Sequence, residues 1–204
     1  MLRIAIQAKG RLNEKTMALL ADAGISASVG SRSLIAHAKG FPVDLLLLRD
    51  DDIPQAVSMG TADIGIVGLN EVEEKNVDVK RVLDLGFGGC RLSLAVPREA
   101  DYKGLEWFNG KRIATSYPEI LSRFLKEKNI NAKIHTITGS VEIAPAVGMA
   151  DAIFDIVSSG GTLIQNGLVE VESILESQAV LIATPGLPEE KQAELDKLCF
   201  RFRS

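Results

Sequence analysis

Short apolar runs alternate with longer amphipathic segments along most of this chain. The runs are rich in Ile, Val and Leu, as is typical of buried strands. We predict strands at Arg3–Ile6, Val43–Leu48, Ile64–Val67, Ser93–Val96, Arg112–Thr115, Ile134–Thr138 and Ala152–Val157. Apolar positions recur at helical spacing at Leu12–Ala23, Pro54–Met59, Pro118–Lys128 and Val141–Val147. This alternation predicts an α/β fold with mostly parallel sheets and helices on both faces.

The alternation of strands and helices stops near the end of the chain. Leu168–Leu175 and Ala179–Thr184 follow one another as strands, and Glu189–Phe202 is predicted as a last helix. The alternating charges of Glu71–Arg81 are typical of a solvated helix.

One segment of the chain resembles another. Gly60–Gly68 and Gly148–Asp155 each run from a glycine through an Ala-Asp pair into an apolar strand. The match can be chance. The alternative is a pair of similar α/β lobes, which would hold a ligand between them at the carboxyl ends of their strands.

Composition narrows the function classes. The 204 residues suffice for one large domain or two small lobes. A net charge of −4 and 5% aromatic residues argue against a nucleic-acid binder. The apolar runs are too short for a membrane span, and the N-terminus does not have the pattern of a signal peptide. Cys90 and Cys199 lie in no metal-ligand spacing, and neither His37 nor His135 has a carboxylate at such spacing. We therefore expect a cytoplasmic enzyme that uses neither zinc nor histidine-based catalysis.

The strand Ala152–Val157 stops in Ser-Ser-Gly-Gly-Thr, residues 158–162. Two glycines let successive N–H groups point into one concavity, and the hydroxyl groups add donors, which suits a phosphate monoester. Asp151 and Asp155 could accept hydrogen bonds from sugar hydroxyls. These residues alone equally fit a strand that ends in an ordinary glycine turn.

Charged residues follow two other predicted strands. Lys9, Gly10 and Arg11 come after the first strand, and Arg49-Asp50-Asp51-Asp52 after the second. With Arg32, these cations could neutralise a polyphosphate, because arginine suits bidentate phosphate contacts. They also fit solvated surface turns. Glu142 opens a predicted helix, where it would also complement the helix dipole.

At this point a resemblance emerges from motifs that cover essentially the whole chain. They are Arg3–Leu12, Leu48–Pro54, Ala62–Gly68, Gly89–Leu94, Lys111–Pro118, Gly139–Pro145 and Ala150–Leu163. In this order they resemble the catalytic subunit of the ATP phosphoribosyltransferase family, which acts in the first step of histidine biosynthesis.

The resemblance implies a two-lobed, periplasmic-binding-protein-like (type II) fold with a cleft between the lobes. Lobe one would comprise residues 1–87 and 180–204, and lobe two residues 88–179 with the loop for phosphoribosyl pyrophosphate. The implied reaction transfers the 5-phosphoribosyl group to N1 of ATP and releases pyrophosphate.

The resemblance also implies the site residues. We expect catalytic roles for Arg11, Arg32, Asp155 and Glu142. Substrate contacts are expected from Lys9, Gly10, Arg49, Asp50, Tyr117, Asp151, Ser158, Ser159, Gly160, Gly161, Thr162 and Leu163. The expected cofactor, Mg²⁺, would arrive with the pyrophosphate and need no protein ligand.

Other interpretations stay open at this stage. A two-lobed module that only binds a small anion, or a phosphoribosyltransferase with another acceptor base, would share the fold. The resemblance implies a homodimer or higher homo-oligomer and allows a separate regulatory subunit. No segment looks able to form a histidine-binding regulatory domain, so the chain is either a natural short form or a truncated long one. We expect histidine not to inhibit it.

Overall fold

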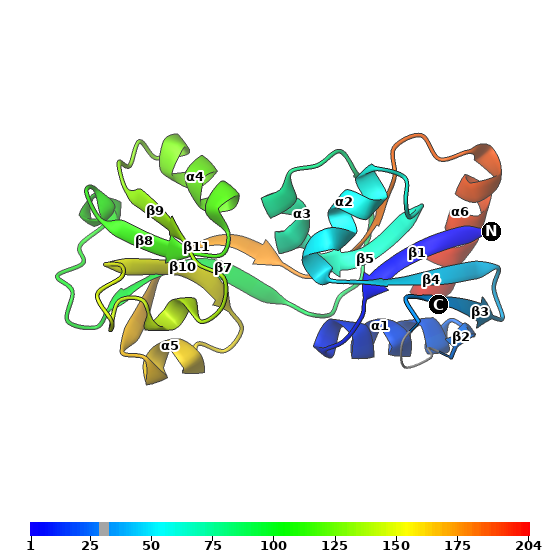
Figure 1. Cartoon of the computed structure of the whole chain (residues 1–204), viewed down its shortest axis with the longest axis horizontal. Helices are drawn as coiled ribbons and strands as arrows, with labels where there is room; N and C mark the ends of the chain where they lie inside the picture. Colours follow the sequence, from blue (N-terminus) through cyan, green and yellow to red (C-terminus); the bar gives the residue numbers. More distant parts are fainter. Residues whose placement is uncertain (29–32) are drawn as a thin grey trace. The chain divides into compact units, whose positions relative to one another are not determined.

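The computed structural model describes residues 1–28 and 33–204. The chain divides into two compact units (Figure 1). Unit 1 comprises Met1–Gly88 and Gln178–Ser204, and unit 2 comprises Gly89–Ser177. No helix among the described residues is long and apolar enough to cross a lipid bilayer.

A mixed sheet forms the centre of unit 1, with strands in the order β2-β3-β4-β1-β5-β12-β6. β1 pairs in parallel with β4 and β5, and the flanking pairs are antiparallel. The strands are β1 (Leu2–Gln7), β2 (Ser26–Ala27), β3 (Ile35–Lys39), β4 (Val43–Leu48), β5 (Ile64–Gly68), β6 (Lys80–Asp84) and β12 (Ala179–Ala183).

Helices cover both faces of this sheet because side chains alternate along its strands. Ile4 and Ile6 of β1 pack in one apolar cluster with Leu20 and Leu198, whereas Ala5 packs in another with Val57. The helices are α1 (Arg11–Asp22), α2 (Ile53–Ser58), α3 (Leu69–Lys75) and α6 (Glu189–Arg203), with a 3₁₀ turn at Asp50–Asp52. α1 and α6 therefore share one face of the sheet, and α2 lies on the other.

Unit 2 has a second mixed sheet, in the order β11-β7-β10-β8-β9. β10, β8 and β9 are parallel neighbours, and β7 pairs antiparallel with both β10 and β11. The strands are β7 (Cys90–Pro97), β8 (Arg112–Thr115), β9 (Lys133–Thr136), β10 (Ala152–Val157) and β11 (Leu168–Ser177).

Two apolar clusters cover the faces of the second sheet. Phe154 of β10 packs with Leu121 of α4 (Pro118–Glu127), on the face that also buries the 3₁₀ turn η2 (Leu105–Phe108). Ile153 and Val157 pack on the opposite face, under the 3₁₀ turn η3 (Val141–Ile143) and the short helix α5 (Gly161–Gln165). Asp155 shares the face of Ile153 and Val157, because it lies two residues from each along the strand.

Three differences between the structure and the predicted elements have a clear physical reason. The segment predicted as a helix over Val141–Val147 is only a 3₁₀ turn, since Pro145 in its middle has no N–H for a helical bond. The charged segment predicted as one helix is helical only to Lys75 and continues into β6. β3 was not predicted, because only Ala36 of the strand is buried and the polar residues His37 and Lys39 leave no apolar run.

Candidate active site

The loop after β10 has the geometry of a sharp strand-to-helix turn. Gly160 has a φ of 82°, in the left-handed region that favours glycine, and directly precedes α5. Ile164 N–H donates to the Gly160 carbonyl at 3.2 Å. The N–H groups of residues 161–163 come before this first helical bond and so have no acceptor within the helix.

Side chains of this loop divide between solvent and core. Ser158, Ser159, Gly161 and Thr162 are exposed, so their polar groups are accessible to a ligand. Leu163 is buried in the cluster with Val157, so its side chain anchors the turn. Of the residues predicted to bind phosphate, Leu163 can therefore contribute only backbone groups.

Asp155 lies three residues before the loop and is half-buried. Burial raises the pKa of its carboxyl from 3.8 to about 6; the Ile156 N–H, which donates to Oδ1 at 2.8 Å, opposes this shift, and the charge of Glu142 adds to it. Glu142 lies in the 3₁₀ turn η3, which packs against β10, so the two carboxylates for which the resemblance implies catalytic roles lie on neighbouring elements of unit 2.

Beside Asp155 lies a polar network that sequence reasoning missed. Arg91 of β7 donates to Glu170 of β11 from Nε to Oε1 at 2.5 Å and from the terminal guanidinium nitrogen Nη2 to Oε2 at 2.6 Å. Ser93 Oγ donates to the same Glu170 at 2.7 Å. In the strand register, Ser93 is opposite Asp155 and Arg91 is opposite Val157. The signal available in the sequence was the alternation of Arg91 and Ser93 with apolar residues in β7.

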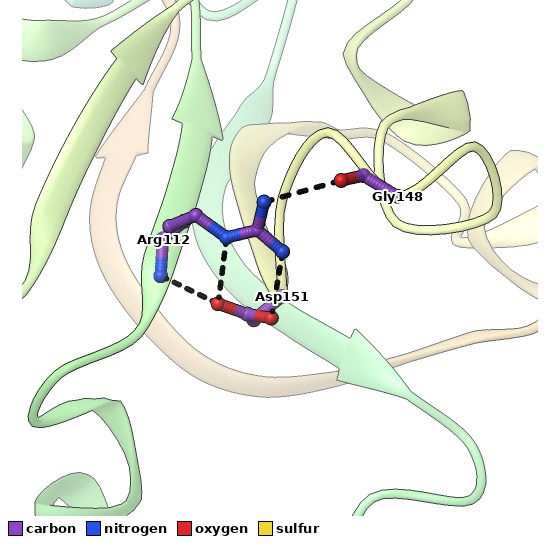
Figure 2. A network of polar contacts seen from close by, with 3 residues as sticks. All are labelled: Arg112, Gly148 and Asp151. Atoms are coloured by element: carbon purple, nitrogen blue, oxygen red, sulfur yellow. Dashed lines mark hydrogen bonds and ion pairs between the residues drawn. The ribbon is translucent and has the colours of Figure 1, made fainter.

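Asp151 directly precedes β10, at the end of the strand opposite the loop. Figure 2 shows its polar contacts. Its Oδ2 accepts the backbone N–H of Arg112 at 2.8 Å, and its carboxylate receives Nε and Nη2 of the same residue at 3.2 Å each. Arg112 also holds the Gly148 carbonyl at 3.1 Å. Arg112 thereby lowers the pKa of the Asp151 carboxyl.

Six strand residues separate Asp151 from Ser158, a span of roughly 20 Å. Asp151 therefore cannot hold a sugar whose phosphate rests on the loop, and we correct its predicted role to that of a structural contact with β8.

Tyr117 also departs from its predicted role. It is 9% exposed and packs in the cluster under α4, with Ile120 and Leu121. Its ring has little free surface on which an adenine could stack, so we correct this candidate to a core residue.

In unit 1, the predicted cations lie at the carboxyl ends of two neighbouring strands. β1 and β4 are parallel and in register to Gln7 and Leu48, and the N–H of Ala8 donates to the Leu48 carbonyl at 2.7 Å. Lys9 and Arg49 therefore follow adjacent strands at one edge of the sheet.

The residues around this edge are accessible. Lys9, Gly10 and Arg11 are exposed, and Gly10, with a φ of 102°, directly precedes α1. Arg49 Nε lies 3.1 Å from Asp51 Oδ1, and Asp50 Oδ1 accepts the Asp51 N–H at 3.0 Å. Asp50 thus helps to form the turn itself. Arg32, the remaining predicted cation, lies outside the described residues.

Comparison with known proteins identifies the relatives of this chain. A family model described as "HisG: ATP phosphoribosyltransferase" matches residues 49–204. The chain is 60% identical over 204 residues to the ATP phosphoribosyltransferase of Parabacteroides distasonis and 56% identical to that of Bacteroides thetaiotaomicron. Each alignment covers 100% of this chain and 72% of the relative.

Solved structures agree on the fold. The ATP phosphoribosyl transferase (HisG:HisZ) complex from Thermotoga maritima contains a chain that matches with a TM-score of 0.84 and 30% identity, covering 100% of this chain and 99% of that one. A histidine kinase sensor domain similar to periplasmic binding proteins matches with a TM-score of 0.61 at 13% identity, covering 98% and 89%, and so shows the fold alone. The fold is thus the predicted two-lobed type, and the chain belongs to the ATP phosphoribosyltransferase family.

Proposed function

We propose that this chain transfers the 5-phosphoribosyl group of phosphoribosyl pyrophosphate to N1 of ATP, with the loop of residues 158–162 holding the 5-phosphate. The observation that carries this proposal is 60% identity over the whole chain to an enzyme of that name. The reaction is the first step of histidine biosynthesis.

The loop suits the 5-phosphate of the donor. The left-handed Gly160 turns the chain so that the N–H groups of residues 161–163 precede the first helical hydrogen bond. The exposed hydroxyl groups of Ser158, Ser159 and Thr162 add donors. A phosphate monoester accepts from several such groups at once, so the loop would fix one end of the donor.

Asp155 and Glu142 suit the ribose. C1 of the sugar becomes electron-poor as pyrophosphate departs, and carboxylates nearby stabilise developing positive charge. Asp155 is ionised for the most part above its pKa of about 6, so at neutral pH it accepts hydrogen bonds from the sugar hydroxyls. N1 of adenine has a lone pair and no proton to lose, so the attack needs no general base.

The exposed cations of unit 1 suit the phosphates of the leaving group and of ATP. Lys9, Arg11 and Arg49 can offset the charge that pyrophosphate gains as it leaves. We assign Arg32 to the same task from the family resemblance alone. Mg²⁺ would bind to the pyrophosphate oxygens and withdraw electrons from them, as it commonly does in phosphate sites.

The test is a steady-state assay with ATP, phosphoribosyl pyrophosphate and Mg²⁺, followed by the near-ultraviolet absorbance of the N1-ribosylated product. We expect product only when all three are present. A module that merely binds anions would give heat on calorimetric titration with the donor but no product. An enzyme with a different acceptor base would release pyrophosphate only when that base is supplied in place of ATP.

A variant of the loop and its control connect the reaction to the proposed site. Thr162→Val should weaken use of the donor. Thr61→Val is the matched control, because Thr61 is exposed and precedes the amino end of β5 in unit 1. Equal kinetics for both variants would contradict the proposed phosphate contact.

Assembly and location are part of the same proposal. We infer a cytoplasmic homodimer or higher homo-oligomer, and we infer a separate regulatory subunit from the likeness to the HisG:HisZ complex. Light scattering of the purified chain tests the first inference, since a monomer at micromolar concentration would refute it. Growth of a histidine auxotroph carrying the gene tests the pathway.

A further inference from the structure

The network beside Asp155 fixes the direction of one hydrogen bond. An ionised glutamate can only accept, and Glu170 is held ionised because its bonds with Arg91, and to a lesser extent Ser93, lower the pKa of its carboxyl. Ser93 has a single hydroxyl proton. That proton is used in the 2.7 Å bond to Glu170, so the Ser93 oxygen has only lone pairs to offer its other neighbours.

Asp155 is the cross-strand partner of Ser93, on the same face of the sheet. Side chains in such pairs have their Cβ atoms roughly 4.5–5.5 Å apart. Ser93 is 1% exposed, so its hydroxyl group does not contact bulk water. In this register the Ser93 oxygen, which has no further proton to give, belongs to the cross-strand neighbour of Asp155.

The other groups around Asp155 do not replace that missing donor. Glu142 in η3 is negative and raises the pKa of the Asp155 carboxyl. Arg91 is bound by Glu170, and Arg112, on β8, is bound by Asp151 at the other end of the sheet. α5 carries no titratable side chain. The bond that the structure records to the Asp155 carboxylate is the Ile156 N–H.

We propose that Ser93 and Glu170 are positioning residues that keep the Asp155 carboxylate free to accept hydrogen bonds from the vicinal hydroxyls of a pentose phosphate. Because Ser93 donates its proton to Glu170, it does not donate to Asp155. The sugar hydroxyls can therefore donate to the Asp155 carboxylate instead. A serine free to rotate would donate to Asp155 and compete with the sugar. This inference rests on the proposed assignment of Asp155 to the ribose.

The hydrogen-bond direction can be tested without substrate, by NMR titration of the Asp155 side-chain carbon in the free protein. Ser93→Ala should leave the midpoint unchanged or lower it, because it removes only an acceptor of the protonated carboxyl. If Ser93 donated to Asp155 instead, the same variant would raise the midpoint. The direction of the midpoint shift in Ser93→Ala therefore shows whether Ser93 donates to Asp155.

Glu170→Gln should reverse the bond. Arg91 would donate to the amide oxygen, the amide nitrogen would donate to Ser93, and the Ser93 proton would turn to Asp155. We expect the titration midpoint of Asp155 to fall by about one pH unit, because a new hydrogen bond to the ionised carboxylate stabilises it by about that much. The double variant Ser93→Ala/Glu170→Gln keeps the altered charge but lacks the hydroxyl, so its midpoint should return close to that of Ser93→Ala.

Kinetics then test the effect on substrate. Glu170→Gln should raise the KM for phosphoribosyl pyrophosphate about tenfold, with a smaller change in the KM for ATP, and the double variant should recover most of that loss. A merely structural role for Glu170 would make the double variant worse than either single one, which would overturn the proposal.

Two outcomes separate this inference from the function it rests on. Unchanged midpoints in Glu170→Gln would overturn the inference and leave the proposed function standing. Shifted midpoints with unchanged KM values would overturn the positioning role by showing that Asp155 does not contact the sugar. Circular dichroism of each variant confirms that unit 2 is folded.

Discussion

Replacing Asp155 with asparagine should stabilise the protein at neutral pH while it impairs turnover. Burial raises the pKa of this carboxyl from 3.8 to about 6, so the folded state binds a proton more tightly than the unfolded state. Stability contributed by such a group is present below pH 4 and is lost as the pH rises through about 6. Above pH 6 the folded chain therefore carries a carboxylate that it disfavours.

The magnitude follows from the shift. A difference of roughly two units between the folded-state and unfolded-state pKa of Asp155 corresponds to at most about 3 kcal/mol in the free energy of unfolding. Asp155 is only half-buried, so solvent screens part of this, and we expect about 1–2 kcal/mol. Asparagine has nearly the same shape but no charge. Asp155→Asn should therefore be more stable than the parent at pH 8 by that amount, and the difference should vanish near pH 4.

Urea unfolding at pH 4.5, 6 and 8 measures this difference. The single tryptophan of the chain, Trp107, lies in unit 2 with Asp155. Its fluorescence therefore reports the unfolding of the unit that contains the substitution. Glu99→Gln is the matched control, since Glu99 is an exposed carboxylate of the same unit. A gain at pH 8 that equals the control, or that does not shrink on acidification, would refute the argument that burying this charge is unfavourable.

Three further changes test separate parts of the structure. Asp151→Ala should destabilise unit 2 by about 1–3 kcal/mol, because several hydrogen bonds to Arg112 are lost. Since Arg112 lowers the pKa of the Asp151 carboxyl, the stability difference between the parent and this variant should narrow only below about pH 4. Thr162→Val should raise the KM of the donor more than it lowers kcat, and equal falls in kcat and kcat/KM would contradict a contact remote from the breaking bond. Gly160→Ala should destabilise the protein by about 1–2 kcal/mol, because its φ of 82° is unfavourable for alanine, and an unchanged urea midpoint would refute that strain.

Local patterns were enough to predict most of the fold. The strands with continuous apolar runs, such as Val43–Leu48 and Ala152–Val157, lie where the sequence placed them. The strands Ile35–Lys39 and Lys80–Asp84 were missed, because both are mostly exposed or half-buried and lack such a run. Their strand structure depends on neighbours distant in sequence, which a local window does not contain.

Parts of the candidate site could likewise be predicted from local sequence, whereas other parts depend on residues distant in sequence. The loop after β10 could be predicted because its serines and glycines come directly after an apolar strand. The network of Arg91, Ser93 and Glu170 was not, because its partners lie 77 and 79 positions apart. Tyr117 was assigned to a substrate contact from the family resemblance, and only the packing of the fold shows how little of its ring is exposed.

The internal resemblance around the two Ala-Asp pairs has a structural explanation. Asp63 accepts the Arg3 N–H at 2.9 Å and donates its own N–H to the Arg3 carbonyl at 3.0 Å. Asp151 exchanges the same two bonds with Arg112, both at 2.8 Å. In each unit an aspartate just before one parallel strand thus fixes the start of its neighbour. The repeated motif therefore sets strand register at the edge of each sheet opposite the loops. Asp151 lies at that edge, whereas the proposed phosphate loop begins at the far end of the same strand.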